Sequence, residues 1–292
     1  MTDQTLHGSM NGPSAGIIIK EMVRRATDTI YKDRSTFTVN QKVGYDGVAD
    51  DMWTSADKAA QELYLKSLRE CFPDYGVIAE EDELSIQPQN GCTAFFTVDP
   101  LDGTKAYGRK QSHGISTMIS LCQDTTVIAA FVGDINAREV YGYRPNSEKV
   151  HRIANLNDAE LMQRTTPTEP GEVFGLLRDP LKRGYSEQTM TLVESGLFKN
   201  YEIMGSSIGT WMARLWKNEV SALLIPPGYE TPWDSNPVNG ITQALGYRYL
   251  RPTEKDAFAW EPFVPEVLTT IQERQHDVLI VHEIDMHHFV AP

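Results

Sequence analysis

The chain has 292 residues, which is enough to bury a sizeable core as one large domain or as two closely packed halves. Its 40 acidic and 27 basic side chains give a formal net charge of −13, which disfavours binding to nucleic-acid polymers and to anionic membranes. Three scattered cysteines offer neither a disulfide framework nor a zinc-ligand spacing, and no signal peptide or membrane-spanning apolar run is seen, so a cytoplasmic protein is expected.

The first half of the sequence combines two helical patterns with short apolar runs. Apolar side chains at four-residue intervals predict a helix over residues 14–31. Thr54 and Asp57 have the spacing of a capping box, so a second helix is predicted from there to about residue 72. Strands are predicted at residues 75–79, 94–98, 117–121, 127–132 and 139–143.

A polar stretch at residues 155–170 has little periodicity and is the one plausible internal boundary. It divides a single predicted domain, residues 14–290, into halves of about 14–154 and 171–290. In the second half, helices are predicted at residues 184–196, 208–217 and 235–245, and strands at 201–204 and 220–225. This alternation indicates a layered α/β or α+β fold.

The most informative segment is the D-P-L-D-G-T sequence of residues 99–104, which follows an apolar strand. Its proline and glycine predict a turn in which the carboxylates of Asp99 and Asp102 and the carbonyl of Leu101 face one point, an arrangement suited to hard cations. A helix beginning at Thr104 would add free amides for a phosphate. The alternative is an acidic surface turn in which the second aspartate caps the following segment.

Other carboxylates follow predicted strands. Glu80 and Glu81 end the strand at residues 75–79, and Asp234 follows the strand at residues 220–225, where it also suits the N-cap of the next helix. Together with the D-P-L-D-G-T segment, these side chains would supply enough oxygen ligands for two or three Mg²⁺ ions. Crowded carboxylates repel one another unless cations lie between them.

The order of these segments resembles the inositol monophosphatase superfamily, which includes bisphosphate nucleotidases that cleave 3′-phosphoadenosine phosphates. The resemblance covers about residues 14–250. It rests on four segments in order: Trp53-Thr54-Ser55-Ala56-Asp57, Ala79-Glu80-Glu81, residues 99–104 and Trp233-Asp234. It implies an α+β fold, the layered αβαβα sandwich of the inositol monophosphatase and fructose-1,6-bisphosphatase type. Lithium sensitivity and a homodimer are further expectations from the family.

Carried over residue by residue, the resemblance implies that Mg²⁺ is bound by Glu80, Asp99, the Leu101 carbonyl, Asp102 and Asp234. It also implies that Thr104 and Asp57 orient and deprotonate a water molecule and that Glu81 supports the site. The expected phosphate and substrate contacts are Gly103, Thr104, Lys105, Ser206, Ser207 and Glu230. The expected activity is Mg²⁺-dependent hydrolysis of a small phosphate ester, either an inositol monophosphate or a 3′-phosphoadenosine-type nucleotide.

The choice between these esters stays open. Inositol-cleaving members typically have a glutamate seven residues before the aspartate that corresponds to Asp234, and here that position is Pro227. Glu230 would replace it only with a different loop path. Lys105, directly after the D-P-L-D-G-T segment, looks more like the bisphosphate nucleotidase branch, although it also suits a solvated lysine at a helix start. The segment at residues 42–51 is longer than is usual in the family.

Two functions of other classes are alternatives: a serine esterase and a catalytically silent member of the family. Residues 205–209 satisfy G-x-S-x-G, and Asp256 and His282 follow in the order that a serine esterase needs, but no oxyanion segment is seen and the acidic segments would stay unexplained. A catalytically silent member that binds or regulates is the other alternative. His282 and His287 are five residues apart, which does not fit the four-residue spacing of a zinc-protease helix, so a strand followed by a terminal tail is predicted there.

Overall fold

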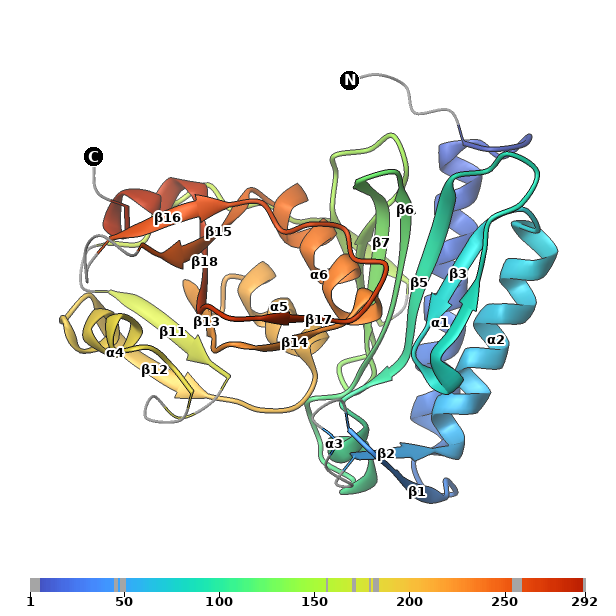
Figure 1. Ribbon diagram of the computed structural model, residues 1–292, viewed down its shortest axis with the longest axis horizontal. Helices are drawn as coiled ribbons and strands as arrows, with labels where there is room; N and C mark the ends of the chain where they lie inside the picture. Colours follow the sequence, from blue (N-terminus) through green and yellow to red (C-terminus); the bar gives the residue numbers. More distant parts are fainter. Residues whose placement is uncertain are drawn as a thin grey trace.

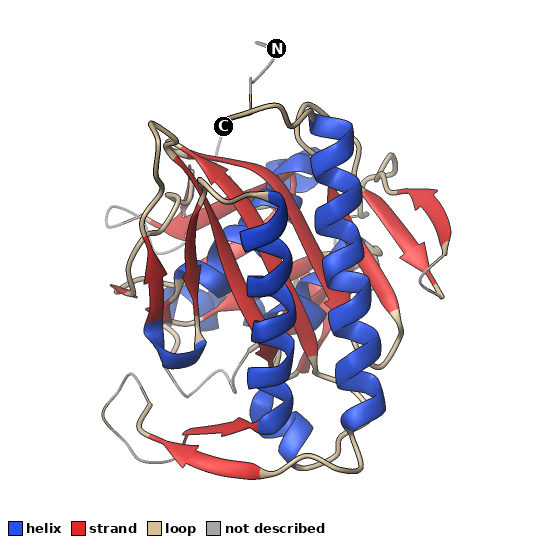
Figure 2. Cartoon of the chain, turned by 90° about the vertical axis from the view of Figure 1, so that its right-hand side faces the viewer, coloured by secondary structure: helices blue, strands red, loops and turns tan. Residues whose placement is uncertain are grey.

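Two long helices, α1 (Gly12–Asp33) and α2 (Ser55–Cys71), lie side by side on one face of the larger sheet in the computed structural model (Figure 2). The structure describes residues 6–44, 47, 51–155, 157–169, 172–178, 180, 184–253 and 259–290. Both helices have bounds close to those predicted, and the capping box of Thr54 and Asp57 is present at the start of α2. Their apolar faces are buried against the sheet.

The larger sheet has eight strands in the order β10-β9-β8-β7-β6-β5-β3-β4. Their bounds are β3 (Gly76–Ala79), β4 (Leu84–Ile86), β5 (Ala94–Asp102), β6 (Ser116–Gln123), β7 (Thr126–Asp134), β8 (Glu139–Tyr143), β9 (His151–Ala154) and β10 (Asp158–Leu161). β3 is parallel to β5, and the other neighbours are antiparallel. β10 lies inside the polar stretch that we interpreted as a boundary. All four of its residues are exposed, so the sequence there is polar although the backbone pairs with β9.

The smaller sheet has six strands in the order β12-β11-β13-β18-β15-β16. Their bounds are β11 (Val173–Leu177), β12 (Phe198–Ile203), β13 (Ala222–Ile225), β15 (Tyr247–Pro252), β16 (Trp260–Phe263) and β18 (Val278–His282). Alternate side chains along a strand point to opposite faces, so each face has its own core. One face packs on α5 (Ile208–Trp216) and α6 (Pro232–Ala244), and the other on α4 (Glu187–Glu194) and the 3₁₀ helix η2 (Glu283–His288).

Helices α5 and α6 also pack against the larger sheet, so they form the middle layer between the two sheets (Figure 1). The layers are therefore α1 and α2, the larger sheet, α5 and α6, the smaller sheet, and α4 with η2. This order confirms the predicted α+β fold with an αβαβα sandwich. Helix η2 stands where a terminal tail was predicted. None of the described helices combines the length and the apolar character that crossing a membrane requires.

Short elements lie near the ends of the sheets. β1 (Val39–Lys42) pairs with β2 (Asp51–Thr54), and β14 (Gly228–Glu230) pairs with β17 (Gln272–Arg274). The 3₁₀ helix η1 (Glu81–Glu83) follows β3, and the short helix α3 (Thr104–Gly108) follows β5. Of the segment at 42–51 noted for its length, residues 45, 46 and 48–50 lie outside the described residues.

Candidate active site

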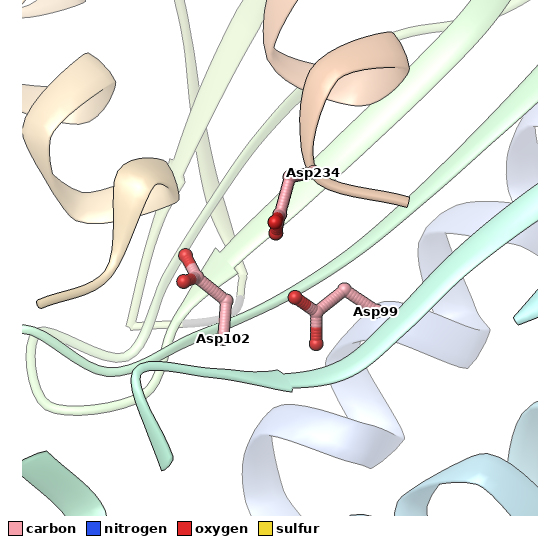
Figure 3. A group of neighbouring side chains, drawn as sticks. All are labelled: Asp99, Asp102 and Asp234. Carbon is pink, nitrogen blue, oxygen red and sulfur yellow. The ribbon is translucent and has the colours of Figure 1, made fainter. Parts of the chain in front are cut away.

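Three aspartates from two elements meet at one point (Figure 3). Asp99 and Asp102 belong to β5, and Asp234 belongs to the first turn of α6. One carboxylate oxygen of each lies within 4.8 Å of those of the other two. Asp99 and Asp102 are buried, whereas Asp234 is partly exposed. The structure thus brings together three of the predicted metal ligands.

The end of β5 explains how two aspartates three residues apart face the same point. The strand continues to Asp102 instead of ending at residue 98 as predicted. Asp99 is opposite Met118 and Asp102 is opposite Ser116, so β5 has one residue more than β6 between these pairs, which is a β-bulge. A proline, which has no N–H for the ladder, is tolerated at such a bulge. A bulge in the strand, rather than a turn, therefore orients the two carboxylates.

Asp102 is held by the N-terminus of α5. Its Oδ2 atom accepts hydrogen bonds from Ser116 Oγ (2.8 Å), Ser207 Oγ (2.5 Å) and the Gly209 amide (2.8 Å). Its Oδ1 atom accepts one longer bond from the Ile208 amide (3.2 Å). Because a carboxylate oxygen has two lone pairs, Oδ1 keeps the capacity for a further ligand, while Oδ2 satisfies donors at the start of the helix.

Asp234 is the third residue of α6. The sequence had indicated that it is the N-cap of this helix, which is wrong. The helix begins at Pro232, a residue favoured in the first turn, and Thr231 is the N-cap. Thr231 Oγ1 lies 2.8 Å from Asp234 Oδ2 and accepts a hydrogen bond from the Asp234 amide (3.2 Å). The N-cap position was misplaced because Thr231 and Asp234 are both good capping residues.

Burial raises the pKa of all three aspartates, and repulsion by neighbouring negative charges adds to the shift for Asp99 and Asp234. For Asp99, burial is the largest cause, followed by the negative charges of Glu80, Asp234 and Asp102. Burial and then the charge of Asp102 raise the pKa of Asp234 to about 7. Burial also raises the pKa of Asp102, although its hydrogen bonds act in the opposite direction. None of the salt bridges between described residues involves these aspartates. An all-oxygen donor set in this electrostatic state fits a divalent cation such as Mg²⁺.

Glu80 and Glu81 follow β3, which is parallel to β5. Glu80 is outside the group of three, but its negative charge raises the pKa of Asp99. Glu81 is buried, and the Gln61 side chain holds its backbone: Oε1 accepts from the Glu81 amide (3.0 Å), and Nε2 donates to the Glu81 carbonyl (2.9 Å). Ligation by Glu80 and the supporting role of Glu81 stay predictions, as does ligation by the Leu101 carbonyl.

Asp57 and Thr104 are joined across 47 residues of sequence. Thr104 Oγ1 lies 3.1 Å from Asp57 Oδ1 and 3.0 Å from the Leu101 carbonyl oxygen. The other oxygen of Asp57 accepts hydrogen bonds from the Thr54 amide (2.7 Å) and hydroxyl (2.5 Å), so the capping box orients the carboxylate towards Thr104. Burial, partly offset by these bonds, raises the pKa of Asp57 to about 7.

Gly103 allows the backbone conformation that brings Thr104 close to Asp57. Its φ of 89° lies in the left-handed region, and an added Cβ would lie 2.2 Å from the Gly114 carbonyl oxygen. Only glycine fits both conditions, so the chain can turn directly from β5 into α3.

A cavity of about 470 Å³ opens beside the aspartates. Asp102 and Asp234 line it together with three predicted contacts, Lys105, Ser206 and Glu230. Ser207, also predicted as a contact, is fully buried beneath Asp102, where its hydroxyl orients that carboxylate.

Sequence interpretation missed two arginines that line this cavity. The Arg178 guanidinium carbon lies 5.4 Å from the centroid of the Trp211 ring. Arg274 Nε donates to Glu230 Oε1 at 2.9 Å, so this predicted contact already has a cationic partner. Arg178 directly follows β11, a strand that was not predicted from the sequence. Had that strand been predicted, its end would have been a candidate position for a site residue. Arg274 on β17 and Glu230 on β14 are far apart in the sequence, so no local sequence pattern indicates that they meet.

The arrangement considered for a serine esterase is not formed. The hydroxyl of Ser207 bonds to Asp102, and the Nε2 atom of His282 bonds to the Leu245 carbonyl (3.0 Å). Asp256 lies outside the described residues. The G-x-S-x-G segment is the cap of α5, because Ser207 is its N-cap and accepts a hydrogen bond within the first turn.

Fold and site together define a layered αβαβα protein with a group of carboxylates at the bulged end of a central strand. The model of the inositol monophosphatase family matches residues 16–287. The chain therefore belongs to the inositol monophosphatase family.

Individual relatives are distant. The chain is 28% identical over 172 residues to the Nus factor SuhB of Xylella fastidiosa, which is 56% of this chain and 58% of that protein. It is 40% identical over 58 residues to the 3′(2′),5′-bisphosphate nucleotidase CysQ of Salmonella typhimurium, which is 20% of this chain and 24% of that protein. Both matches thus span less than two thirds of the relative. A solved IMPase/NADP phosphatase complexed with NADP and Ca²⁺ has a TM-score of 0.67 at 16% identity, with 99% of this chain and 95% of that chain covered, which shows a shared fold.

Proposed function

We propose that this chain is a Mg²⁺-dependent phosphomonoesterase that hydrolyses a small phosphate ester. The observation that carries the proposal is the group of Asp99, Asp102 and Asp234, whose carboxylates lie together. Asp102 and Asp234 line a cavity, and none of the salt bridges between described residues involves the three aspartates. Hydrolysis of a phosphate ester needs a positioned nucleophile and neutralisation of charge on the phosphoryl group. Anionic oxygens beside a cavity serve this reaction only when they hold cations, which is why Mg²⁺ belongs to the proposal.

The three aspartates would hold the ions, two or three in number, together with Glu80 and the Leu101 carbonyl. Bound Mg²⁺ supplies Lewis acidity and positive charge, which favour deprotonation of water and neutralise phosphoryl oxygens. Asp102 is already fixed by four hydrogen bonds, so little side-chain entropy would be lost when a cation binds.

Asp57 would accept the proton of the attacking water through Thr104. The link between Thr104 Oγ1 and Asp57 Oδ1 is 3.1 Å long, within the range for proton transfer along a hydrogen bond. A pKa of about 7, caused mainly by burial, suits a group that takes up protons near neutral pH. Glu81 would support this carboxylate, and the amides of Gly103 and Thr104 would bind phosphate oxygens.

The substrate would be an inositol monophosphate or a 3′-phosphoadenosine-type nucleotide. Lys105 and Ser206 line the cavity and would contact it. One relative is named a bisphosphate nucleotidase and one solved relative contains NADP, which supports the nucleotide. Another is named a Nus factor, so a silent binding member is the alternative. Lithium sensitivity and a homodimer are carried forward as expectations from the family, and a cytoplasmic location as the expectation from the cysteine usage and the N-terminal sequence.

A phosphate-release screen tests the proposal. The purified protein is given inositol 1-phosphate, 3′-phosphoadenosine 5′-phosphate, fructose 1,6-bisphosphate and histidinol phosphate, with Mg²⁺ and with EDTA. At least one ester should release phosphate with Mg²⁺, and EDTA should abolish the release reversibly. If no ester releases phosphate at any Mg²⁺ concentration, the binding role becomes the better account.

A further inference from the structure

A second cavity, of about 450 Å³, adjoins the cavity at the aspartates. The residues that line both cavities are Ile208, Ile225, Glu230, Ser235 and Arg274. The two cavities therefore lie side by side and have part of their wall in common. Each volume alone is within the range of about 300–1,000 Å³ usual for small-molecule sites.

The junction between the cavities is a fixed part of the fold. Arg274 is buried, and its guanidinium donates to Glu230 Oε1 (2.9 Å) and to the Pro226 carbonyl (3.0 Å). These residues join β17 to β14 and to the turn after β13. Since two segments hold the arginine, its side chain has a fixed place in the common wall of the two cavities.

Aromatic side chains form part of the wall of the second cavity. Tyr249, Phe263 and His276 line it. The Phe263 ring centroid lies 6.1 Å from that of Tyr249 and 5.3 Å from that of His276, both in edge-to-face geometry. Burial is the main cause that lowers the pKa of His276, which favours the uncharged form of its ring. Val264 at this lining is 77% exposed, which leaves an apolar side chain facing solvent.

We propose that the ester cleaved at the aspartates carries an aromatic or heteroaromatic ring on its alcohol part and that this ring occupies the second cavity. Phe263 and His276 are then specificity-determining residues. This inference rests on the proposed phosphatase function. Ring–ring contacts and burial of apolar surface stabilise such a ligand. A compact polyol phosphate fits the first cavity alone and gains nothing from these side chains.

The test compares two esters with the same reacting bond, adenosine 3′-monophosphate and 1-O-methylribose 3-phosphate, which lacks the base. In Mg²⁺, the wild-type kcat/KM should favour the nucleotide by about tenfold or more, the size expected for one stacked base. Phe263→Leu keeps apolar volume but removes the ring. It should raise KM for the nucleotide about fivefold and leave the kinetics of the abasic ester unchanged.

Tyr201→Ala is the matched control, because Tyr201 is an exposed aromatic residue on β12 that lines neither cavity. It should change neither ester. Equal wild-type kcat/KM for the two esters would overturn the ring subsite while the phosphatase stands, and this measurement needs no variant to fold. If neither ester is hydrolysed, the phosphate-release screen decides whether the phosphatase stands, and calorimetric titration with both esters decides the subsite. Equal affinities overturn it, and tighter binding of the nucleotide that Phe263→Leu weakens supports it.

Discussion

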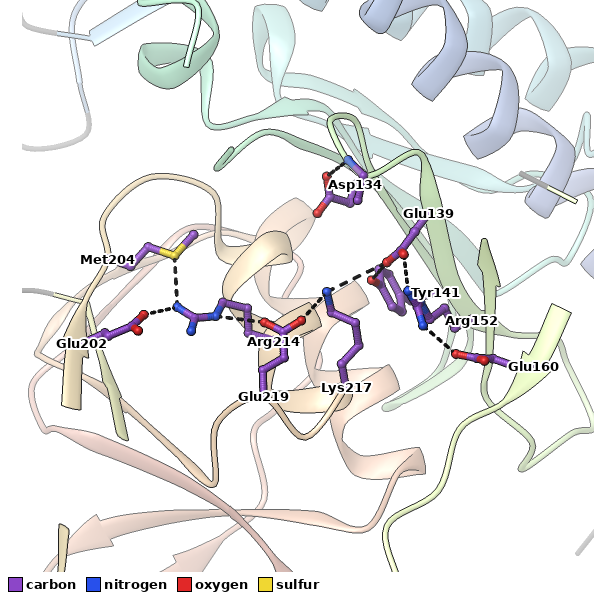
Figure 4. Close-up of polar contacts among 11 residues, drawn as sticks. Asp134, Glu139, Tyr141, Arg152, Glu160, Glu202, Met204, Arg214, Lys217 and Glu219 are labelled. Carbon is purple, nitrogen blue, oxygen red and sulfur yellow. Dashed lines mark hydrogen bonds and ion pairs between the residues drawn. The ribbon is translucent and has the colours of Figure 1, made fainter. Parts of the chain in front are cut away.

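Asp99 and Asp102 of the candidate site and Glu139 on β8 are buried carboxylates whose pKa values are shifted in opposite directions. At the site, burial and neighbouring negative charge raise the pKa of Asp99 and Asp234. At Glu139, burial acts in the same direction, but hydrogen bonds from Arg152 and Tyr141 outweigh it and the pKa is lowered (Figure 4). The comparison shows that the partners of a buried carboxylate decide whether the rise in pKa that burial causes is kept or reversed.

The Glu139 region extends from the larger sheet to the end of α5. Lys217 lies 4.0 Å from Glu139 and 2.7 Å from Glu219, and Arg152 also reaches Glu160 at 2.8 Å (Figure 4). Here the protein supplies its own cations, which is typical of a structural network. At the aspartates none of the salt bridges between described residues supplies a positive charge, and perturbed carboxylates at a cavity are typical of a functional site.

The largest expected effect comes from removing one carboxylate of the site. Asp99→Asn should reduce Mg²⁺-dependent phosphate release to background, because loss of a residue that only orients a ligand already costs about 10–100-fold in metal affinity. The same variant should melt at a higher temperature than wild type in EDTA, since one buried repulsive charge is gone. Phosphate release and thermal melting measure the two effects. Activity close to wild type would remove Asp99 from the metal site.

Asp57→Asn should have the next largest effect. The asparagine keeps an oxygen for capping α2, a contribution of about 1 kcal/mol, but cannot take up a proton, so kcat should fall by about 10²–10³-fold. Steady-state kinetics and a melting curve check this pair of outcomes. Thr54→Ser is the matched control because it keeps the capping hydroxyl. An Asp57→Asn enzyme with unchanged kcat would contradict the proton-acceptor role.

The stability of the metal-free protein should fall as pH rises. Asp234 has a folded-state pKa of about 7 against an ordinary value of 3.8, so the folded state binds more protons than the unfolded state between these values. The contribution of Asp234 to stability is therefore highest below its ordinary pKa and decreases until pH reaches about 7. Melting in EDTA at pH 5 and pH 8 should differ by several degrees, and Mg²⁺ should stabilise the protein most at pH 8. Asp234→Asn should reduce the difference. A melting temperature independent of pH, with and without Mg²⁺, would argue against this account.

Glu139→Gln should give the smallest effect on activity and a clear effect on stability. It leaves Arg152 without its most buried anionic partner, and an unsatisfied polar group costs about 1–3 kcal/mol. Urea unfolding measures this loss, while the Mg²⁺ dependence of phosphate release should stay as in wild type. Destabilisation by Glu139→Gln together with stabilisation by Asp99→Asn in EDTA would establish the contrast between the two regions.

Local patterns in the sequence predicted much of the fold. Helices α1 and α2, the capping box and β8 were expected from periodicity and spacing and are confirmed. β10 was missed because its four residues are all exposed, so its pairing leaves no apolar pattern. β14 and β17 were missed because each has only three residues.

At the candidate site, the sequence by itself determined the residue types: aspartates flanking Leu101, a glycine that alone tolerates the turn into α3, and a threonine and aspartate with capping spacing. Tertiary structure alone decided that Asp102 receives the amides of α5, more than 100 residues further along the chain, and that Arg274 meets Glu230. It also decided which carboxylates have a raised pKa and which a lowered one. Local turns depend on neighbouring residues, whereas desolvation and long-range partners exist only after the layers have packed.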